Sequence, residues 1–452
     1  MSTHNRNPSG KNQHAHDADF EDQLAVGLRR YHREAKTDNK EIAALLLADY
    51  KITTSASTVK RRRKALGLSG GGATVKKMAK ADAVQLVLNK VDKDPAKRAG
   101  VRTIRATVAF EDGVILTRQV IETVNFAPTM IFNLACRQIV WEIMQDHDGD
   151  SFALREPTAK KVFRVAKFPI GINQRWAMDG HDKLYKIGFP VYAIVDDATG
   201  KILKASVVPS NRFGEIVCYR FLCLVEELGG MPIQTTTDCG SETTLLFGVV
   251  NTLRHQFHPE IDSVEVPPHV YLRSVHNISV ERQWLRLRLD FGDNCVLTFN
   301  KGTEDLKYNS NDPDQYELCQ WLWPRFIQTG LDDYAARRNI IKMRKQSDKP
   351  GPSAMSRNTA YSLPETWGGR QCLQPVDIDV IRQMKLDMGG DALIAFSTPQ
   401  FAARAQLAYD ALGIQKLEQG NIWDVFRDML PLVFPGRVLR SRTFSVSWLV
   451  SP

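Results

Sequence analysis

Apolar residues recur at spacings of three and four near the start of the chain, which is the period of an amphipathic helix. The pattern predicts helices over residues 21–36, 39–50 and 57–68, the last opened by Ser57 as its N-cap. Two helices, a short turn and a basic third helix are typical of a helix-turn-helix DNA-binding domain, which we place at residues 20–70. A plain helical hairpin fits the same pattern, so DNA binding stays open at this point.

Helical spacing continues beyond a glycine-rich segment at residues 69–77, which we interpret as a linker. Residues 80–126 contain further helical patterns, with Thr117 as the cap of the last helix. They predict a second helix-turn-helix-like domain within residues 80–150, with the same alternative of a plain helical hairpin.

From about residue 165 the helical pattern gives way to short apolar runs that indicate strands. The runs QRWAMDG, FPVYAIVDD and KILKASVVP predict three strands, followed by helix, strand, helix, strand and helix. This order predicts an α/β domain, a mixed sheet flanked by helices, over residues 165–345. We expect a separate C-terminal domain of unknown role at residues 370–452, with a helix at FAARAQLAYDALG and a strand at SRTFSVSWLV.

Charge divides the chain unequally. Residues 1–100 carry 20 Lys and Arg against 11 Asp and Glu, whereas the other residues carry 40 of each kind. A basic N-terminal part favours nucleic-acid binding, because Lys and Arg neutralise phosphates, although a solubilising basic tail is the alternative. The candidate DNA-binding residues lie in the third predicted helix: Lys60, Arg61, Arg62, Arg63 and Lys64. Five consecutive charges cannot all face one groove, so some must contact phosphates or water.

Other features exclude several classes of protein. Residues 1–19 are polar, lack the apolar stretch of a signal peptide and predict a disordered tail. No stretch approaches the roughly 18 consecutive apolar residues typical of a membrane span. The seven cysteines are scattered and form no C-x-x-C pair, so they predict neither a disulfide framework nor a zinc finger. We therefore expect a soluble intracellular protein with reduced thiols.

Three acidic residues fall at the ends of predicted elements on one side of the sheet. Asp179 ends the first strand, Asp238 ends the fourth, and Glu281 lies in the first turn of the last helix. Clustered carboxylates repel one another unless a hard cation neutralises them, and Mg²⁺ or Mn²⁺ suits oxygen ligands. Because the chain holds 51 Asp and Glu, such a placement also arises by chance.

The sequence segments around these acids resemble those of a known family. WAMDGHDKL with GFPVYAIVDDATGKIL, then TTTDCGSETT, then SVHNISVERQW look like the three blocks of the integrase core of retroviral integrases and DDE transposases. The resemblance is greatest to the integrase-core proteins of eukaryotic mobile elements. It implies an RNase H-like fold in which Asp179, Asp238 and Glu281 hold two Mg²⁺ or Mn²⁺ ions and catalyse strand cleavage and strand transfer.

The resemblance also implies partners and a location: double-stranded DNA at the element ends and the target, a homo-oligomer, no membrane, and the nucleus. Among neighbouring residues, His181 and Lys183 are candidates for phosphate contacts, and exposed loop positions are the alternative for both. Arg282 and Arg286 are four residues apart on one helix and share a face that could meet DNA phosphates. We interpret Trp284, on the same helix, as a core residue.

Two other functions fit the same sequence. A DNA-binding protein derived from a mobile element would keep the fold without catalysing strand transfer. A metal-dependent nuclease without joining activity would use the same three acids. The sequence does not separate cutting from joining.

Overall fold

The structure, a computed structural model, describes residues 18–94, 99–116, 168–181, 184–272, 278–346 and 350–437. The chain divides into two compact units. The first comprises residues 1–88 and 101–147, and the second comprises residues 89–100 and 148–452. In the described part, no helix is both long and apolar enough to cross a membrane.

The first unit is helical. Its first three helices confirm the predicted pattern, and the helices of this region are α1 (Ala18–Arg33), α2 (Asn39–Tyr50), α3 (Ala56–Ala65), α4 (Gly71–Lys77), α5 (Lys80–Asp92) and α6 (Val101–Asp112). Leu28 and Tyr31 of α1 are buried, and the Tyr31 hydroxyl donates a hydrogen bond to the carbonyl of Leu45 on α2 at 3.0 Å. These contacts pack α2 against α1, and α3 packs against both.

Two predictions for this unit were wrong. The N-cap of α3 is Ser55, because its extended backbone lets its hydroxyl accept the amide of Thr58 at 3.1 Å, a bond that Ser57 cannot make from inside the helix. The predicted linker contains helix α4, which begins after Gly70, whose carbonyl accepts the amides of Ala73 and Thr74. The helix that Thr117 was predicted to cap lies outside the described residues.

The second unit is built on a five-stranded sheet in the order β4-β3-β2-β6-β7. Its strands are β2 (Arg175–His181), β3 (Val191–Asp196), β4 (Ile202–Val207), β6 (Gln234–Asp238) and β7 (His269–Leu272). Strand β3 runs antiparallel to both of its neighbours, β2 and β4, and β6 and β7 run parallel to β2. The predicted mixed sheet is confirmed, and it fits an RNase H-like fold.

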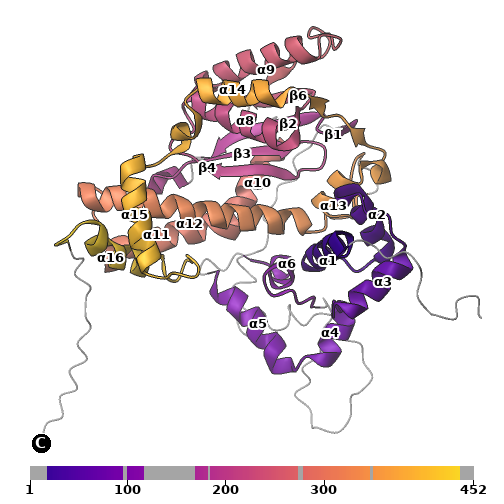
Figure 1. Cartoon of the computed structure of the whole chain (residues 1–452), viewed down its shortest axis with the longest axis horizontal. Coiled ribbons are helices and arrows are strands. Elements are labelled where there is room, and N and C mark those ends of the chain that lie inside the picture. The colour runs from indigo at the N-terminus through magenta and orange to yellow at the C-terminus, as the bar shows by residue number, and fades with distance from the viewer. Residues whose placement is uncertain are drawn as a thin grey trace, which may run out of the picture. The chain divides into compact units, whose positions relative to one another are not determined.

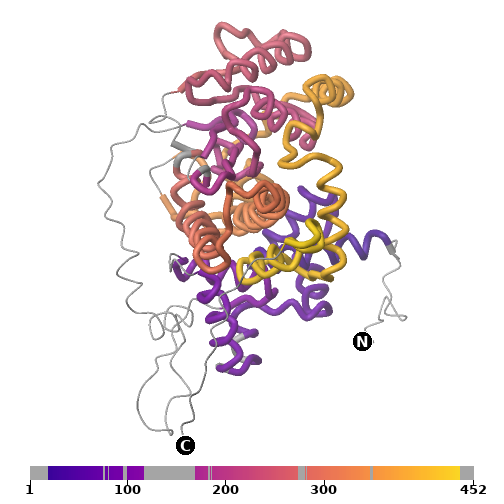
Figure 2. The backbone as a smooth tube through the Cα atoms, turned by 90° about the vertical axis from the view of Figure 1, so that its left-hand side faces the viewer, coloured from indigo at the N-terminus to yellow at the C-terminus, as the bar shows by residue number. Residues whose placement is uncertain are grey.

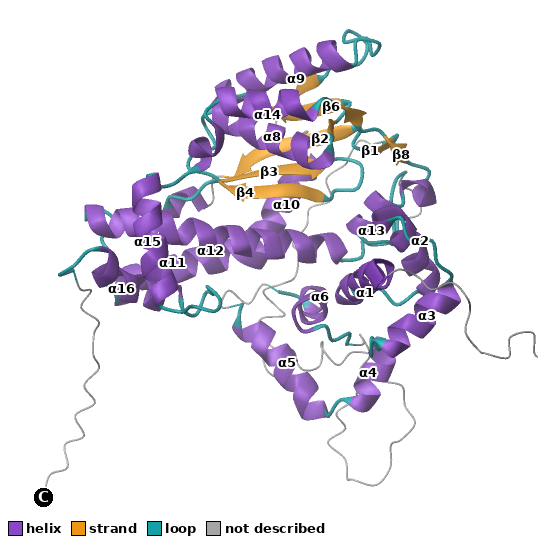
Figure 3. Cartoon of the chain, in the orientation of Figure 1, coloured by secondary structure: helices purple, strands orange, loops and turns teal. Residues whose placement is uncertain are grey.

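Helices cover both faces of this sheet (Figures 1 and 3). On one face lie α8 (Gly214–Leu228) and α9 (Thr244–Phe257), and on the other lie α10 (Ile278–Leu287), α11 (Asp293–Asp305) and α12 (Pro313–Ile340). Side chains alternate between the faces. Trp176 and Met178 of β2 therefore join the core under α8 and α9, whereas Ala177 joins the core under α10 and α12.

Short elements complete this unit. The short strands are β1 (Gly171–Ile172), β5 (Gly230–Met231), β8 (Arg370–Gln371) and β9 (Gln374–Pro375). The short helices are η1 (Leu184–Ile187), η2 (Ser241–Thr243), the π-helix η4 (Arg288–Gly292), α13 (Arg357–Ser362), η5 (Pro364–Trp367) and η6 (Gly390–Ile394).

The described part of the C-terminal segment belongs to the second unit, so the domain boundary predicted at residue 370 is not found there. Helix α14 (Ile378–Asp387) buries Ile381 in the core under α8. Helices α15 (Pro399–Ala411) and α16 (Ile422–Val433) pack against α12 and against each other (Figures 1 and 2). Their buried side chains lie in the same core as Ala177. The strand predicted at SRTFSVSWLV lies outside the described residues.

Candidate metal centre

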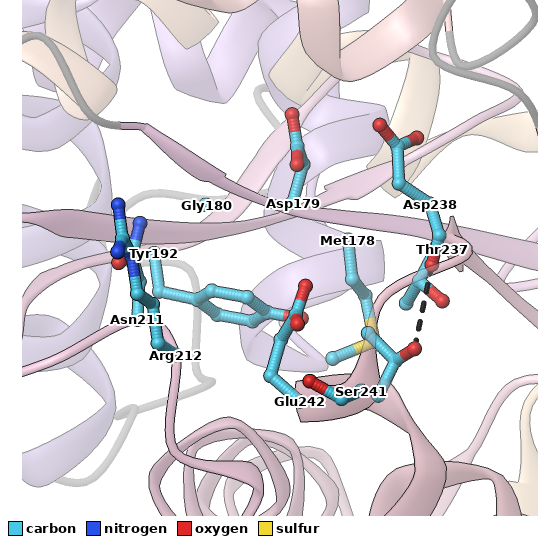
Figure 4. A pocket seen from close by; sticks show the side chains of 11 residues that line it. Met178, Asp179, Gly180, Tyr192, Asn211, Arg212, Thr237, Asp238, Ser241 and Glu242 are labelled. Carbon is cyan, nitrogen blue, oxygen red and sulfur yellow. Dashed lines mark hydrogen bonds between the residues drawn. The ribbon is translucent and has the colours of Figure 1, made fainter.

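Asp179 and Asp238 lie at the same edge of the sheet on neighbouring parallel strands. The register pairs Ala177 of β2 with Thr236 of β6, and each acid follows two residues later. Because residues two apart share a face, both carboxylates stand on the side of the sheet that α10 covers. Figure 4 shows them side by side above the strand ends. The sequence prediction that these two acids converge agrees with this placement.

The sequence predicted that Asp179 ends its strand, and this prediction was wrong. Strand β6 stops at Asp238, but β2 continues through Gly180 to His181 because β3 pairs with it as far as Val191. At Asp179, β2 therefore no longer pairs with β6 but still pairs with β3.

One carboxylate oxygen of Asp238 is buried and has no hydrogen-bond partner within the described part of the chain. Burying an unpaired carboxylate oxygen costs free energy, because water that solvated it is removed and nothing replaces that water. A divalent cation between the acids would satisfy this atom, and hard oxygen ligands are what Mg²⁺ and Mn²⁺ prefer. The residues present thus fit such an ion.

Asp179 accepts a hydrogen bond from Trp284, a residue that the sequence predicted only to be part of the core. The indole N–H of Trp284, on α10, donates a hydrogen bond to Oδ2 of Asp179 at 2.7 Å. Trp284 is 6% exposed, so it is also a core residue as predicted. Its ring stacks on the imidazole of His181, with centroids 4.6 Å apart and planes 9° apart. His181 is itself buried, and its predicted phosphate contact stays a prediction.

The third predicted ligand is only partly placed. Residue 281 belongs to α10, one turn before Trp284. The side chain of Glu281 lies outside the described residues, as does Lys183. Among the side chains that are described, no group of three His, Cys, Asp or Glu could hold a metal ion.

A pocket of about 440 Å³ opens at the same strand ends, and 11 residues line it (Figure 4). Glu242 lies on the opposite side of the sheet from the carboxylates of Asp179 and Asp238 and points toward the ring of Tyr192. The Tyr192 hydroxyl is buried with no described hydrogen-bond partner. Burial, and then the negative charges of Asp179 and Glu242, raise the pKa of Tyr192 well above its ordinary value. Neither Tyr192 nor Glu242 was among the residues predicted from the sequence, although the spacing Asp238-x-Gly240-x-Glu242 was a signal for Glu242.

Two arginines of α10 face outward. Arg282 and Arg286 are exposed, while Gln283 and Trp284 between them are buried. This agrees with the shared face predicted from their spacing, and their contact with DNA stays a prediction.

The five basic residues of α3 divide into two groups. Lys60, Arg61 and Lys64 are exposed. Arg62 pairs with Glu21 on α1. Arg63 is buried and donates to the carbonyl of Thr37 at 3.0 Å and to Oδ1 of Asn39 at 2.8 Å. Burial lowers the pKa of Arg63 from its ordinary value.

Comparison with known families gives one match. Residues 162–360 match the family model described as an integrase core domain. A comparison with the curated proteins finds no match. The matched residues contain the five-stranded sheet, both described acids and α10.

Proposed function

Because residues 162–360 form an integrase core domain, we propose that the chain is a polynucleotidyl transferase that cuts DNA strands and joins them to a second DNA. The observation that carries the proposal is the pair Asp179 and Asp238 on adjacent parallel strands, with one buried oxygen of Asp238 lacking a hydrogen-bond partner among the described residues. Two carboxylates placed so close together would repel each other unless a cation lies between them.

Asp179, Asp238 and Glu281 would hold two Mg²⁺ or Mn²⁺ ions. When bound, such a pair of ions stabilises the attacking and leaving oxygens of a phosphodiester during an in-line displacement. The contact between Trp284 and Asp179 supports Glu281 as the third ligand, because residue 281 lies one turn before Trp284 on α10. These acids support cutting and joining equally, so the products of the reaction decide between the two.

DNA would be held by basic residues outside the acidic centre. Arg282 and Arg286 are exposed on the helix that contacts Asp179, where they can bind phosphates of a strand entering the site. Lys60, Arg61 and Lys64 of α3 are the matching candidates for recognition of a DNA end. We extend the proposal to a homo-oligomer that holds two DNA ends and to a nuclear location. Light scattering of the DNA complex and imaging of the tagged full chain test these two extensions.

The central experiment incubates the full chain with labelled DNA that carries the ends of its own element and with Mg²⁺ or Mn²⁺. We expect cleaved and joined products from the wild type and neither product from Asp238→Asn. Glu304→Gln is the matched control, because Glu304 is an exposed acid on α11. If Asp238→Asn gave both products at wild-type rates, the assignment of Asp238 as a metal ligand would be wrong.

Other outcomes separate the alternative functions. DNA binding by the wild type without any cleavage would indicate a non-catalytic DNA-binding protein. Cleavage without joining, over a range of target DNAs, would indicate a nuclease.

A further inference from the structure

Trp284 touches two side chains of β2 at once. Asp179 and His181 are two residues apart and therefore share a face of the strand. The indole N–H of Trp284 donates to the carboxylate of Asp179 at 2.7 Å, and the indole ring lies parallel to the imidazole of His181. The ring thus spans the strand end from the acid to the histidine.

A buried indole N–H is stabilised by an acceptor, and two other tryptophans in the described part of the chain use backbone carbonyls. Trp423 donates to the carbonyl of Thr298 at 2.7 Å, and Trp367 donates to the carbonyl of Ala360 at 2.8 Å. Trp284 instead uses an acid. A hydrogen bond to an ionised carboxylate is about twice as strong as one between neutral groups. Because Trp284 is only 6% exposed, water competes little for this bond.

We propose that Trp284 is a positioning residue for the metal centre, which holds the carboxylate of Asp179 in one orientation and fixes β2 to the helix that carries Glu281. This inference rests on the proposed function, since Asp179 must be a metal ligand. An ionised carboxylate has about four acceptor positions, so one hydrogen bond orients it while leaving positions for a cation. The stack on His181 keeps the indole plane, and with it the N–H, in place.

The physical basis is the orientation of a ligand by a second side chain. A carboxylate that is free to rotate must become ordered when an ion binds. In addition, ligands from two different elements must be held at a fixed distance from each other to bind the same ion. Outer partners of metal ligands commonly change metal affinity by about 10–100-fold when they are replaced. Trp284 meets both requirements, because it orients Asp179 and belongs to α10.

The test compares Trp284→Phe with Trp423→Phe in the full chain. Each variant keeps an aromatic ring and loses an indole N–H that donates at 2.7 Å, but only one of the two bonds reaches the acidic centre. Calorimetric titration with Mn²⁺ alone should show about 10–100-fold weaker binding for Trp284→Phe and unchanged binding for Trp423→Phe. In the cleavage assay, a high Mn²⁺ concentration should restore the rate of Trp284→Phe, which a merely structural defect would not allow.

Wild-type affinity for Mn²⁺ in a folded Trp284→Phe variant would overturn the positioning role. If Trp284→Phe fails to fold, His181→Ala decides, because it keeps the indole N–H and removes the ring that supports it; unchanged Mn²⁺ affinity would then overturn the inference. Failure of the proposed function gives a different result: the wild type itself would not bind Mn²⁺, or Asp238→Asn would bind it as tightly as the wild type.

Discussion

Asp196, at the end of β3, is a fully buried acid with a structural task. Its carboxylate accepts hydrogen bonds from the amide of Asn173 at 2.8 Å and from the amide and hydroxyl of Thr199 at 2.9 and 2.6 Å. Burial raises the pKa of Asp196 to about 6, and these hydrogen bonds oppose the rise. The residue closes the turn between β3 and β4 and links it to the start of β2.

The raised pKa predicts a pH dependence of stability. Between about pH 4 and pH 6 the folded chain keeps the Asp196 proton while the unfolded chain loses it, so the free energy of unfolding falls as the pH rises through this window. The loss is on the order of 3 kcal/mol, since one pKa unit corresponds to about 1.4 kcal/mol. Urea unfolding of wild type and Asp196→Asn at pH 4 and pH 7 measures it. The difference in free energy of unfolding between wild type and Asp196→Asn should change between pH 4 and pH 7. The same difference at both pH values would contradict the raised pKa of Asp196.

At the residue scale, the sequence predicted part of the candidate site. Asp179 and Asp238 could be placed together because each was predicted at the end of a strand, and the carboxyl ends of parallel strands share an edge of the sheet. In the structure Asp238 ends β6, whereas β2 continues two residues beyond Asp179. The bond from Trp284 to Asp179 could not be predicted, because it joins residues 105 positions apart and helical spacing marks Trp284 only as apolar. Glu242 was missed because the interpretation placed the acids on one side of the sheet.

At the scale of elements, α3 shows what helical spacing alone leaves undecided. The run of five basic residues predicts a basic helix, but it does not say which side faces inward. Val59 and Arg63 are four residues apart and both are buried, so they define the inner face of α3. Lys60, Arg61 and Lys64 consequently share the outer face. Acceptors on another segment, at Thr37 and Asn39, make burial of Arg63 possible, and no pattern within α3 reveals them.

This division predicts opposite effects for neighbouring arginines. The double variant Arg61→Ala, Lys64→Ala should remain as stable as wild type and bind DNA more weakly, with the slope of log affinity against log salt reduced by about 2. Fluorescence anisotropy with labelled duplex DNA at several salt concentrations measures this slope. Arg63→Ala should instead lower the melting temperature of the first unit, because it removes the donor to the carbonyl of Thr37 and to the side-chain Oδ1 of Asn39. An unchanged salt slope in the double variant would make the outer face of α3 a solubilising surface.

At the scale of the whole second unit, the C-terminal helices complete the cores of the sheet domain. The buried residues Phe401, Ala405 and Ala408 lie at helical spacing along α15, and the sequence predicted that helix correctly. It did not predict what the helix packs against, because an apolar helix face specifies that it is buried but not by which partner. The interpretation of residues 370–452 as a separate domain failed at this step.

Helix α16 packs closely against α11. The ring of Trp423 covers Gly302, leaving no room for a Cβ atom, and its indole N–H donates to the carbonyl of Thr298. The ring also packs against Phe299 and Phe426. A single methyl group at residue 302 must therefore displace a side chain held by a hydrogen bond and by other rings.

Two glycines in helices of the second unit allow a matched comparison. Gly302→Ala should lower the free energy of unfolding by about 1–3 kcal/mol, because overpacking a filled core forces neighbouring side chains to shift. A Cβ atom at Gly248, on α9, would have no neighbour within 4 Å. Gly248→Ala should therefore raise the free energy of unfolding by about 0.5–1 kcal/mol through helix propensity. Urea unfolding of the full chain measures both. If Gly302→Ala were as stable as Gly248→Ala, α16 would not pack against α11 in solution, and the C-terminal segment would be separable from the sheet domain.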